Sequence, residues 1–200
     1  MPSAARDRIQ KAPIGAWFRP SDLGGGNSAE QVLSRLARDP KGPVVRAAKG
    51  LYYKSGPADP FFGKRKPSPV EVAVQVARGQ GVGPAGSFAA AYLGLSTQVA
   101  PRPLLTVVGT PPTGVRSVDW RTRKNPARAQ LNFAEVAVVE LLTLYPYAVE
   151  ADWEDVVDRV ADLRDRRRIN LERIRRVVVS ERRKPELREN LEQLLLDLAD

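Results

Sequence analysis

The sequence predicts an α+β protein with two domains. The first is a winged helix-turn-helix over residues 1–66, and the second is a mixed α/β domain over residues 67–200 that ends in a helical tail. Three observations predict this architecture. Roughly the first 55 residues carry, in order, signals for a helix, a short helix, a glycine turn, a helix and a hairpin. A segment rich in proline and glycine follows, and the rest alternates apolar β-type runs with helical patterns.

Capping and breaking residues divide the first domain. Pro13 stops the first helix, and Ser21 is an N-cap candidate for the short helix. The glycines at 24–26 form a loop, after which Asn27 or Ser28 caps the next helix. The expected helices cover residues 4–11 and 29–38, and residues 17–23 are expected to form a turn that enters a very short helix. The expected hairpin strands cover residues 44–48 and 51–54.

The helix over residues 29–38 has two different faces. Its apolar residues share one face, which we expect in the core. On the other face, Gln31, Arg35 and Arg38 follow i, i+4, i+7 spacing, with Ser34 beside them. Gln can read adenine and Arg can read guanine, while Ser and Arg also hold phosphates. The pattern favours a DNA-recognition helix over its alternative, an ordinary solvated helix face.

The hairpin is expected to act as a wing that contacts phosphates through Arg46 and Lys49. Gly50 suits the turn because it tolerates a positive φ. The candidate DNA-binding residues are Asn27, Ser28, Gln31, Ser34, Arg35, Arg38, Arg46, Lys49 and Lys54.

Net charge divides the chain in the same way. The 200 residues contain 32 Lys/Arg and 23 Asp/Glu, a formal net charge of +9. Residues 1–68 hold 13 basic and 5 acidic residues, whereas residues 132–200 hold 12 basic and 16 acidic residues. A basic N-terminal part favours an anionic partner, and nucleic acid is the first candidate.

Residues 56–69, GPADPFFGKRKPSP, are expected to form a linker. We expect Phe61 and Phe62 to pin this linker to a neighbouring surface. The basic cluster Lys64-Arg65-Lys66 either touches a DNA backbone or forms a solvated tether.

The second domain is expected to contain two strands and six helices. The strands are expected over residues 103–109 and 115–123, and the helices over residues 70–78, 88–94, 133–144, 153–168, 170–179 and 186–199. Residues 79–86, with four glycines, are expected to form a loop.

Several classes of protein are excluded or disfavoured. The chain has no Cys and no His, which excludes zinc fingers, disulfides, thiol nucleophiles and His-based acid–base chemistry. It shows no membrane span and no signal peptide. We therefore expect a cytoplasmic protein with no membrane partner, no cofactor and no metal.

Two blocks of sequence resemble a known family. The segment GSFAAAYLGLSTQVAPR, residues 86–102, resembles a recurrent block of the AbiEi-type antitoxins of bacterial type IV toxin–antitoxin systems. The segment NSAEQVLSRLARDPKGPVVRAAKGLYYKS is similar to that family's recognition helix, linker and wing. The matching positions in this second block are Gln31, Ser34, Arg35, Lys49, Gly50, Leu51 and Tyr52. The order of elements matches over about residues 17–168, and these two blocks match closely.

The resemblance implies an autorepressor that binds inverted repeats in its own operator. It also implies an antitoxin that opposes a nucleotidyltransferase-like toxin without an obligatory stable complex. Ser87, Ser96, Thr97 and Gln98 would then surround a polar pocket that serves the antitoxin role. Alternatively, Ser96 and Thr97 end a helix and Gln98 pairs with the backbone.

We expect no catalytic activity. Asp119, with Glu71 and Lys124, only faintly matches the acids and lysine of a metal-dependent nuclease, and the chain has no Walker or GxGxxG motif. Two other functions stay open: a metal-dependent nucleic-acid nuclease, or a protein-interaction module that uses the acidic helical tail.

Overall fold

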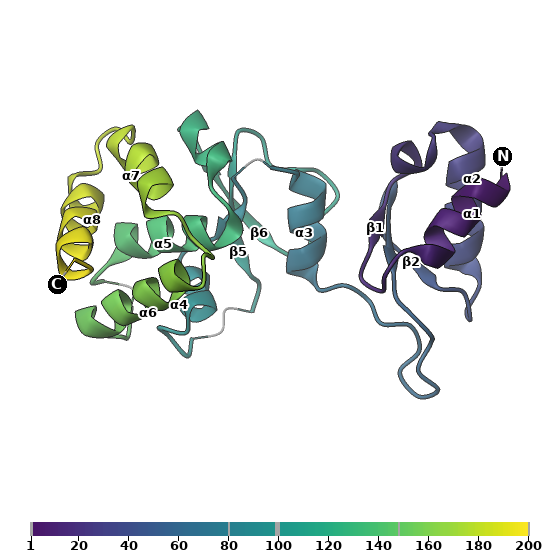
Figure 1. The fold of residues 1–200 in the computed structure, drawn as a ribbon, viewed down its shortest axis with the longest axis horizontal. Coiled ribbons are helices and arrows are strands. Elements are labelled where there is room, and N and C mark those ends of the chain that lie inside the picture. Colours follow the sequence, from purple (N-terminus) through teal and green to yellow (C-terminus); the bar gives the residue numbers. More distant parts are fainter. Residues whose placement is uncertain (1, 80, 99–100, 148, 200) are drawn as a thin grey trace. The chain divides into compact units, whose positions relative to one another are not determined.

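The computed structural model describes residues 2–79, 81–98, 101–147 and 149–199. These residues form eight α-helices, two 3-10 helices and two three-stranded sheets, which confirms the α+β class. The chain divides into two compact units, Met1–Val76 and Ala77–Asp200 (Figure 1). The division falls within α3 (Pro69–Ala77), whereas the sequence placed it between residues 66 and 67.

The first unit contains helices and a small antiparallel sheet of order β1-β3-β2. Its elements are α1 (Pro2–Lys11), β1 (Trp17–Phe18), η1 (Pro20–Leu23), α2 (Gly26–Arg38), β2 (Val44–Ala48) and β3 (Leu51–Lys54). The expected hairpin is confirmed, and Gly50 in its turn has a φ of 66°. The core includes Ile9, Leu33 and Tyr52, all fully buried.

The beginnings of two helices differ from the sequence expectation. Helix α2 begins at Gly26 with Gly25 as its N-cap, so Asn27 and Ser28 lie in its first turn and do not cap it. The 3-10 helix begins after Arg19, so Ser21 lies inside it. Gly25 has a φ of 71°, a conformation that glycine adopts without strain. The glycines thus turn the chain directly into the helix, and no side-chain cap is used.

The segment between β3 and α3 contains no helix or strand, as expected for a linker. However, Phe61 and Phe62 are 92% and 90% exposed, so the expectation that they pin it to a surface is wrong. Their backbone N–H groups donate to Asp59 Oδ1 at 2.8 and 2.9 Å. Asp59 and Gly63 also exchange two backbone hydrogen bonds. This turn is held by its backbone and one carboxylate, without packing of the aromatic rings.

The second unit contains a mixed sheet in which β5 (Leu104–Val108) pairs antiparallel with β4 (Gly83–Pro84) and parallel with β6 (Asp119–Arg123). Its helices are α4 (Ser87–Leu93), η2 (Pro126–Gln130), α5 (Phe133–Leu144), α6 (Trp153–Asp165), α7 (Leu171–Val179) and α8 (Pro185–Asp197). The expected second strand is shorter than predicted, because residues 115–118 form a loop that still buries Val115 and Val118.

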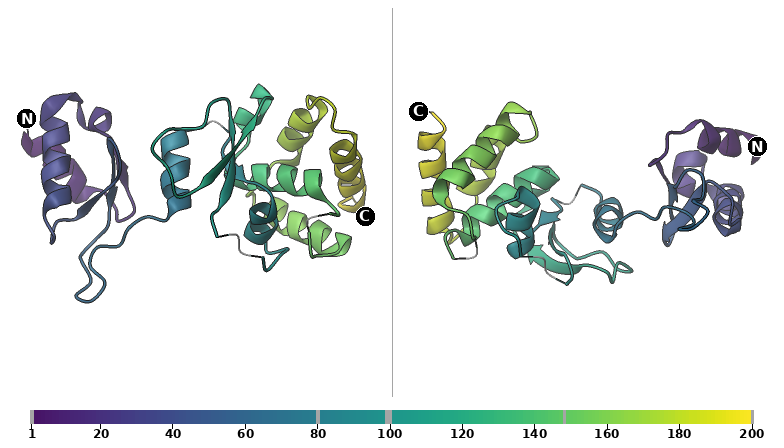
Figure 2. Two further views of the ribbon diagram at one scale, coloured as in Figure 1. Left: turned by 180° about the vertical axis from the view of Figure 1, so that it is seen from behind. Right: turned by 90° about the horizontal axis from the view of Figure 1, so that it is seen from below.

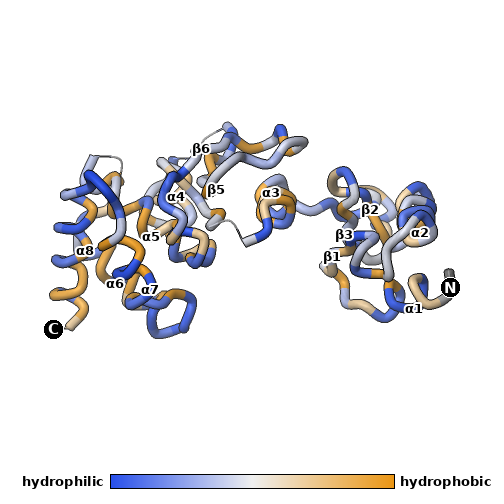
Figure 3. The backbone as a smooth tube through the Cα atoms, turned by 90° about the horizontal axis from the view of Figure 1, so that it is seen from above, coloured by the Kyte–Doolittle hydropathy of each residue, from blue (hydrophilic) through white to orange (hydrophobic). Residues whose placement is uncertain are grey.

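Helix α5 lies at the centre of this unit. Every residue from 134 to 142 is buried, and the surrounding core includes side chains from α4, α6, α7 and α8. The ribbon views in Figure 2 show the helices of this unit gathered together. In Figure 3 hydrophobic colour predominates along α5, whereas α8 alternates between hydrophobic and hydrophilic residues. The sequence predicted the ends of α5 correctly, since Asn132 caps its start and Pro146 follows its end.

Two carboxylates are completely buried on this central helix. Glu140 forms ion pairs with Arg123 of β6 and with Arg128 of η2, and Arg128 also pairs with Glu181. Glu135 accepts hydrogen bonds from the backbone N–H groups of Asn132 and Asn170, both at 2.8 Å. These contacts tie α5 to the sheet, to η2 and to the segments that flank α7.

Substituting Arg128→Ala should destabilise the second unit strongly. The change leaves Glu181 without its partner and Glu140 with one cation fewer, in a site where Arg128 is only 2% exposed. Removing one partner from a buried ion pair costs about 3–5 kcal/mol. Urea unfolding followed by circular dichroism measures this loss.

The matched control is Arg166→Ala, which removes an exposed arginine paired with Asp162. An exposed pair contributes about 0.2–1 kcal/mol. Equal losses in the two variants would show that the buried network does not hold this unit together.

Candidate nucleic-acid interface

The exposed face of α2 gathers the residues that its spacing singled out. Gln31, Ser34, Arg35 and Arg38 line one open groove of about 340 Å³, together with Glu30. The opposite face buries Ala29 and Leu33, as expected. Among the described residues, neither Arg35 nor Arg38 has an ion-pair partner. Their guanidinium groups therefore remain available for an anionic ligand.

Glu30 and Tyr52 fix α2 to the sheet, and sequence reasoning did not find this contact. The buried Tyr52 hydroxyl donates to Glu30 Oε1 at 2.9 Å. Burial, and then the hydrogen bond and charge of Glu30, raise the pKa of Tyr52, whereas the positive charges of Arg46 and Arg38 lower it. The two residues are 22 positions apart, and no local pattern marks them as a pair.

The hairpin brings Arg46 to the side of the sheet that faces α2. Arg46 is the register partner of Tyr52, so their side chains lie on the same face of the antiparallel pair. Arg46 is exposed, and Lys49 is exposed in the turn between β2 and β3. Asn27 and Ser28 are also exposed, one turn before Gln31 on α2.

Lys54 does not belong to this surface. It is only 8% exposed, and its Nζ donates to the carbonyl oxygens of Ile9, Gln10 and Ala12 at 2.9, 2.6 and 2.6 Å. The last carbonyls of a helix lack partners within the helix, and Lys54 satisfies those at the end of α1. We therefore correct the prediction and exclude Lys54 from the candidate interface.

The basic cluster that follows the Phe61–Phe62 turn is only partly exposed. Lys64 Nζ donates to the carbonyl oxygen of Val44 at 2.8 Å, and burial lowers the pKa of Lys64. Arg65 and Lys66 are exposed. Lys64 thus anchors the linker to β2, and two cations of the cluster face solvent.

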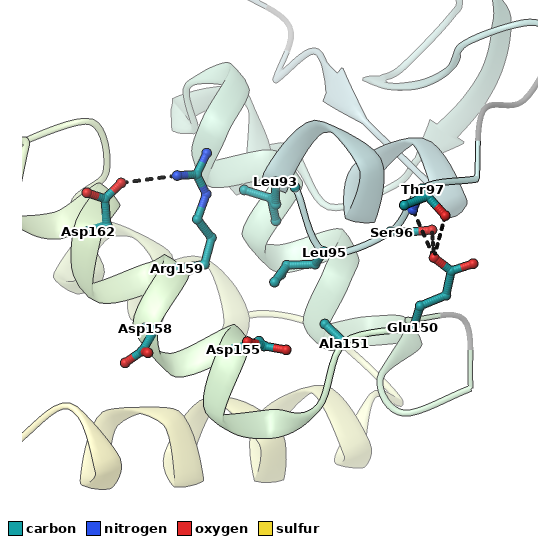
Figure 4. A pocket seen from close by; sticks show the side chains of 11 residues that line it. Leu93, Leu95, Ser96, Thr97, Glu150, Ala151, Asp155, Asp158, Arg159 and Asp162 are labelled. Atoms are coloured by element: carbon teal, nitrogen blue, oxygen red, sulfur yellow. Dashed lines mark hydrogen bonds and ion pairs between the residues drawn. The ribbon is translucent and has the colours of Figure 1, made fainter.

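A separate groove lies in the second unit, beside the block at residues 86–102 (Figure 4). Its volume is about 670 Å³. Ser96 Oγ and the Thr97 N–H donate to Glu150 Oε2 at 3.0 and 2.8 Å, and together they lower the pKa of Glu150, with the Thr97 N–H acting most strongly. Across the groove lie the α6 side chains Asp155, Asp158, Arg159 and Asp162.

For residues 86–102 the sequence left two possibilities: a polar pocket, or a helix that ends at Ser96 and Thr97. Helix α4 ends at Leu93 with Gly94 as its cap, so Ser96 and Thr97 do not end the helix. The Gln98 N–H donates to Ser96 Oγ at 3.1 Å. Ser87 lies at the start of α4, outside the residues that line the groove, and residues 99 and 100 fall outside the described chain. A polar groove is present, with Glu150 as the residue that the sequence did not indicate.

The acids considered for a nuclease have other partners. Glu71 accepts from the Ser68 N–H at 2.7 Å at the start of α3, and Asp119 forms an exposed ion pair with Arg102. Within the described ranges, no group of three or more Asp, Glu, His or Cys side chains is arranged to hold a metal ion. In the same ranges, no helix has the length and apolar character needed to span a membrane.

Comparisons with known proteins show the family. The family described as "Family of unknown function (DUF6088)" matches residues 5–124, so the chain belongs to it. No curated protein sequence matches the chain significantly. The crystal structure of the RV2827C protein from Mycobacterium tuberculosis is similar with a TM-score of 0.48 and 18% identity, over 98% of this chain and 76% of that chain. This similarity is too low to carry a functional argument.

Substituting Tyr52→Phe tests the contact that fixes α2. The change removes the hydrogen bond to Glu30 and keeps the aromatic ring in the core. A hydrogen bond to a charged group contributes about 1.5–3 kcal/mol, so we expect the free energy of unfolding at neutral pH to fall by that amount. Urea unfolding measures the difference.

The same variant tests the raised pKa of Tyr52. Because the folded state holds the phenol proton more tightly than the unfolded state, this contribution to stability is complete below the ordinary pKa of 10.0. It is lost as the pH rises through the raised value. The parent should therefore lose more stability than Tyr52→Phe in alkaline solution, and parallel pH profiles would contradict the assignment.

Proposed function

We propose that this member of the DUF6088 family is a sequence-specific DNA-binding autorepressor whose first unit acts as a winged helix-turn-helix. Helix α2 would enter the major groove, and the β2–β3 hairpin would serve as the wing. The observation that carries the proposal is the exposed stripe of Gln31, Arg35 and Arg38, opposite a face that is packed in the core.

Charge and element order support the same proposal. Residues 1–68 carry 13 basic and 5 acidic residues, an excess suited to a polyanion. The succession of α1, β1, η1, α2, β2 and β3 is the order expected of a winged helix. The contact between Tyr52 and Glu30 fixes α2 against the strand that carries the wing, so both would meet one duplex in a defined register.

The side chains divide into two proposed roles. Gln31 and Arg35, which lie away from the two ends of α2, would read base edges. Ser34, the polar residues at the ends of α2 and those on the hairpin would hold phosphates and so position the helix. These phosphate-contacting residues are Asn27, Ser28, Ser34, Arg38, Arg46 and Lys49.

We further propose that the chain is the antitoxin of a type IV toxin–antitoxin system and has no enzymatic activity. The support is the resemblance of residues 86–102 to the AbiEi-type block. The functional partner would be a nucleotidyltransferase-like toxin, opposed without an obligatory stable complex. We assign this role to the second unit, where Ser96, Thr97 and Glu150 line a groove.

Substituting Arg35→Ala tests the DNA-binding proposal. Loss of a bidentate contact to guanine should weaken binding to the DNA upstream of the chain's own gene by about 1–3 kcal/mol and relax specificity at one position. A gel-shift titration at fixed salt measures both effects. Affinity equal to that of the parent would show that α2 does not read the operator.

The matched control is Lys49→Ala, which removes a proposed phosphate contact from the wing. It should weaken every duplex by a similar factor and lower the salt slope by about one unit. An effect confined to one operator sequence would instead make Lys49 a base reader.

Growth rescue tests the antitoxin proposal. The cognate toxin is expressed from a promoter that lacks the operator, so repression cannot lower its amount. The parent and Arg35→Ala should then restore growth equally, because the altered residue lies outside the second unit. Rescue that disappears with Arg35→Ala, or a parent that does not rescue, would contradict an antitoxin role of the second unit.

A further inference from the structure

A second pocket in the Ala77–Asp200 unit, different from the groove beside Glu150, has a basic lining. It has a volume of about 640 Å³ and lies between residues 122–128 and the turn that joins α7 to α8. Its charged lining residues are the cations Arg123, Lys124, Arg128, Arg182 and Lys184 and the single anion Glu181.

The cations of this pocket differ in whether they are already paired. Arg123 binds Glu140, and Arg128 binds both Glu140 and Glu181. The other three, Lys124, Arg182 and Lys184, have no ion pair or side-chain hydrogen bond with the described residues. Five cations against Glu140 and Glu181 leave a net charge of +3 at the pocket.

The pocket borders the beginning of α8. Lys184 is the N-cap of this 13-residue helix, and its side chain makes no capping hydrogen bond. The N-terminal end of a helix carries a partial positive charge and unpaired N–H groups. Here Pro185 supplies no N–H and Glu186 places an acid in the first turn, so the three unpaired cations provide the main attraction for an anion.

We propose that this pocket binds an oligophosphate, either as a free anion or as the phosphate chain of a nucleotide. A net charge of +3 exceeds the charge of a single phosphate group, which favours a ligand with two or more. The volume lies within the range of about 300–1,000 Å³ found for small-ligand pockets. No aromatic side chain is among the described lining residues, and recognition therefore rests on the phosphates. This site is independent of the proposed DNA interface on α2.

Isothermal titration calorimetry on the full chain tests the proposal with inorganic triphosphate, ATP and adenosine. The double variant Arg182→Gln/Lys184→Gln removes two unpaired cations and leaves Arg128 with its partners. The control Arg175→Gln/Arg176→Gln removes the same charge from exposed positions on α7 that do not line the pocket. Lys124→Gln is a second pocket variant on the other wall, and circular dichroism checks that every variant is folded.

We expect the parent to bind triphosphate and ATP and not adenosine. The pocket double variant should weaken binding by at least about tenfold, and the control should change it by less than about threefold. Tighter binding of ATP than of triphosphate, with both weakened in the pocket variants, would identify a nucleotide as the source of the phosphates. Binding of ATP without any binding of triphosphate would contradict recognition through the phosphates. Absence of binding by the parent, or equal weakening in the pocket and control variants, would overturn the proposal.

Discussion

The burial of two carboxylates on α5 is the constraint that organises the second unit. A buried charge is costly unless cations and hydrogen-bond donors surround it. Glu140 obtains its cations from β6 and η2, and Glu135 obtains donors from the residues that cap α5 and α7. The partners of Glu135 and Glu140 thus bring segments that are distant in the sequence to the same helix. Apolar side chains make up most of the core around α5, and these polar contacts lie where β6, η2 and the segments flanking α7 meet the helix.

Three residues of this ion-pair network, Arg123, Arg128 and Glu181, also line the basic pocket. Arg128 is held on both sides, by Glu140 and by Glu181, so its guanidinium loses little freedom when a ligand arrives. In the first unit, Lys54 is already fully hydrogen-bonded and Arg35 is not. Lys54 uses all three donors on the end of α1, whereas Arg35 has no ion-pair partner among the described residues. The cations that stay unpaired are the ones left for ligands.

Local signals predicted elements well and distant contacts poorly. The end of helix α5 followed from Pro146, and the β2–β3 hairpin followed from two β-type runs on either side of Gly50, signals that act within a few positions. The exposed stripe of α2 followed from helical spacing alone. By contrast, Lys54 was wrongly predicted to bind DNA, since the carbonyl groups that it contacts are 42 to 45 positions away in the sequence. Glu30, Glu150 and Glu181 were missed for the same reason, since each is defined by a partner at least 22 positions away.

The net charge of a sequence segment indicated the basic surface of the first unit but not the basic pocket of the second. Residues 69–200 contain 19 basic and 18 acidic residues, so their total predicts no preference for an anion. The fold separates these charges: three acids of α6 and Glu150 line one groove, while five cations line the pocket beside α8. The net charge of a segment sums over separate sites, although water and salt screen the charges of one site from those of another. The near-neutral unit can therefore present both an acidic and a basic site, and either ligand preference has to be argued from the arrangement of the side chains.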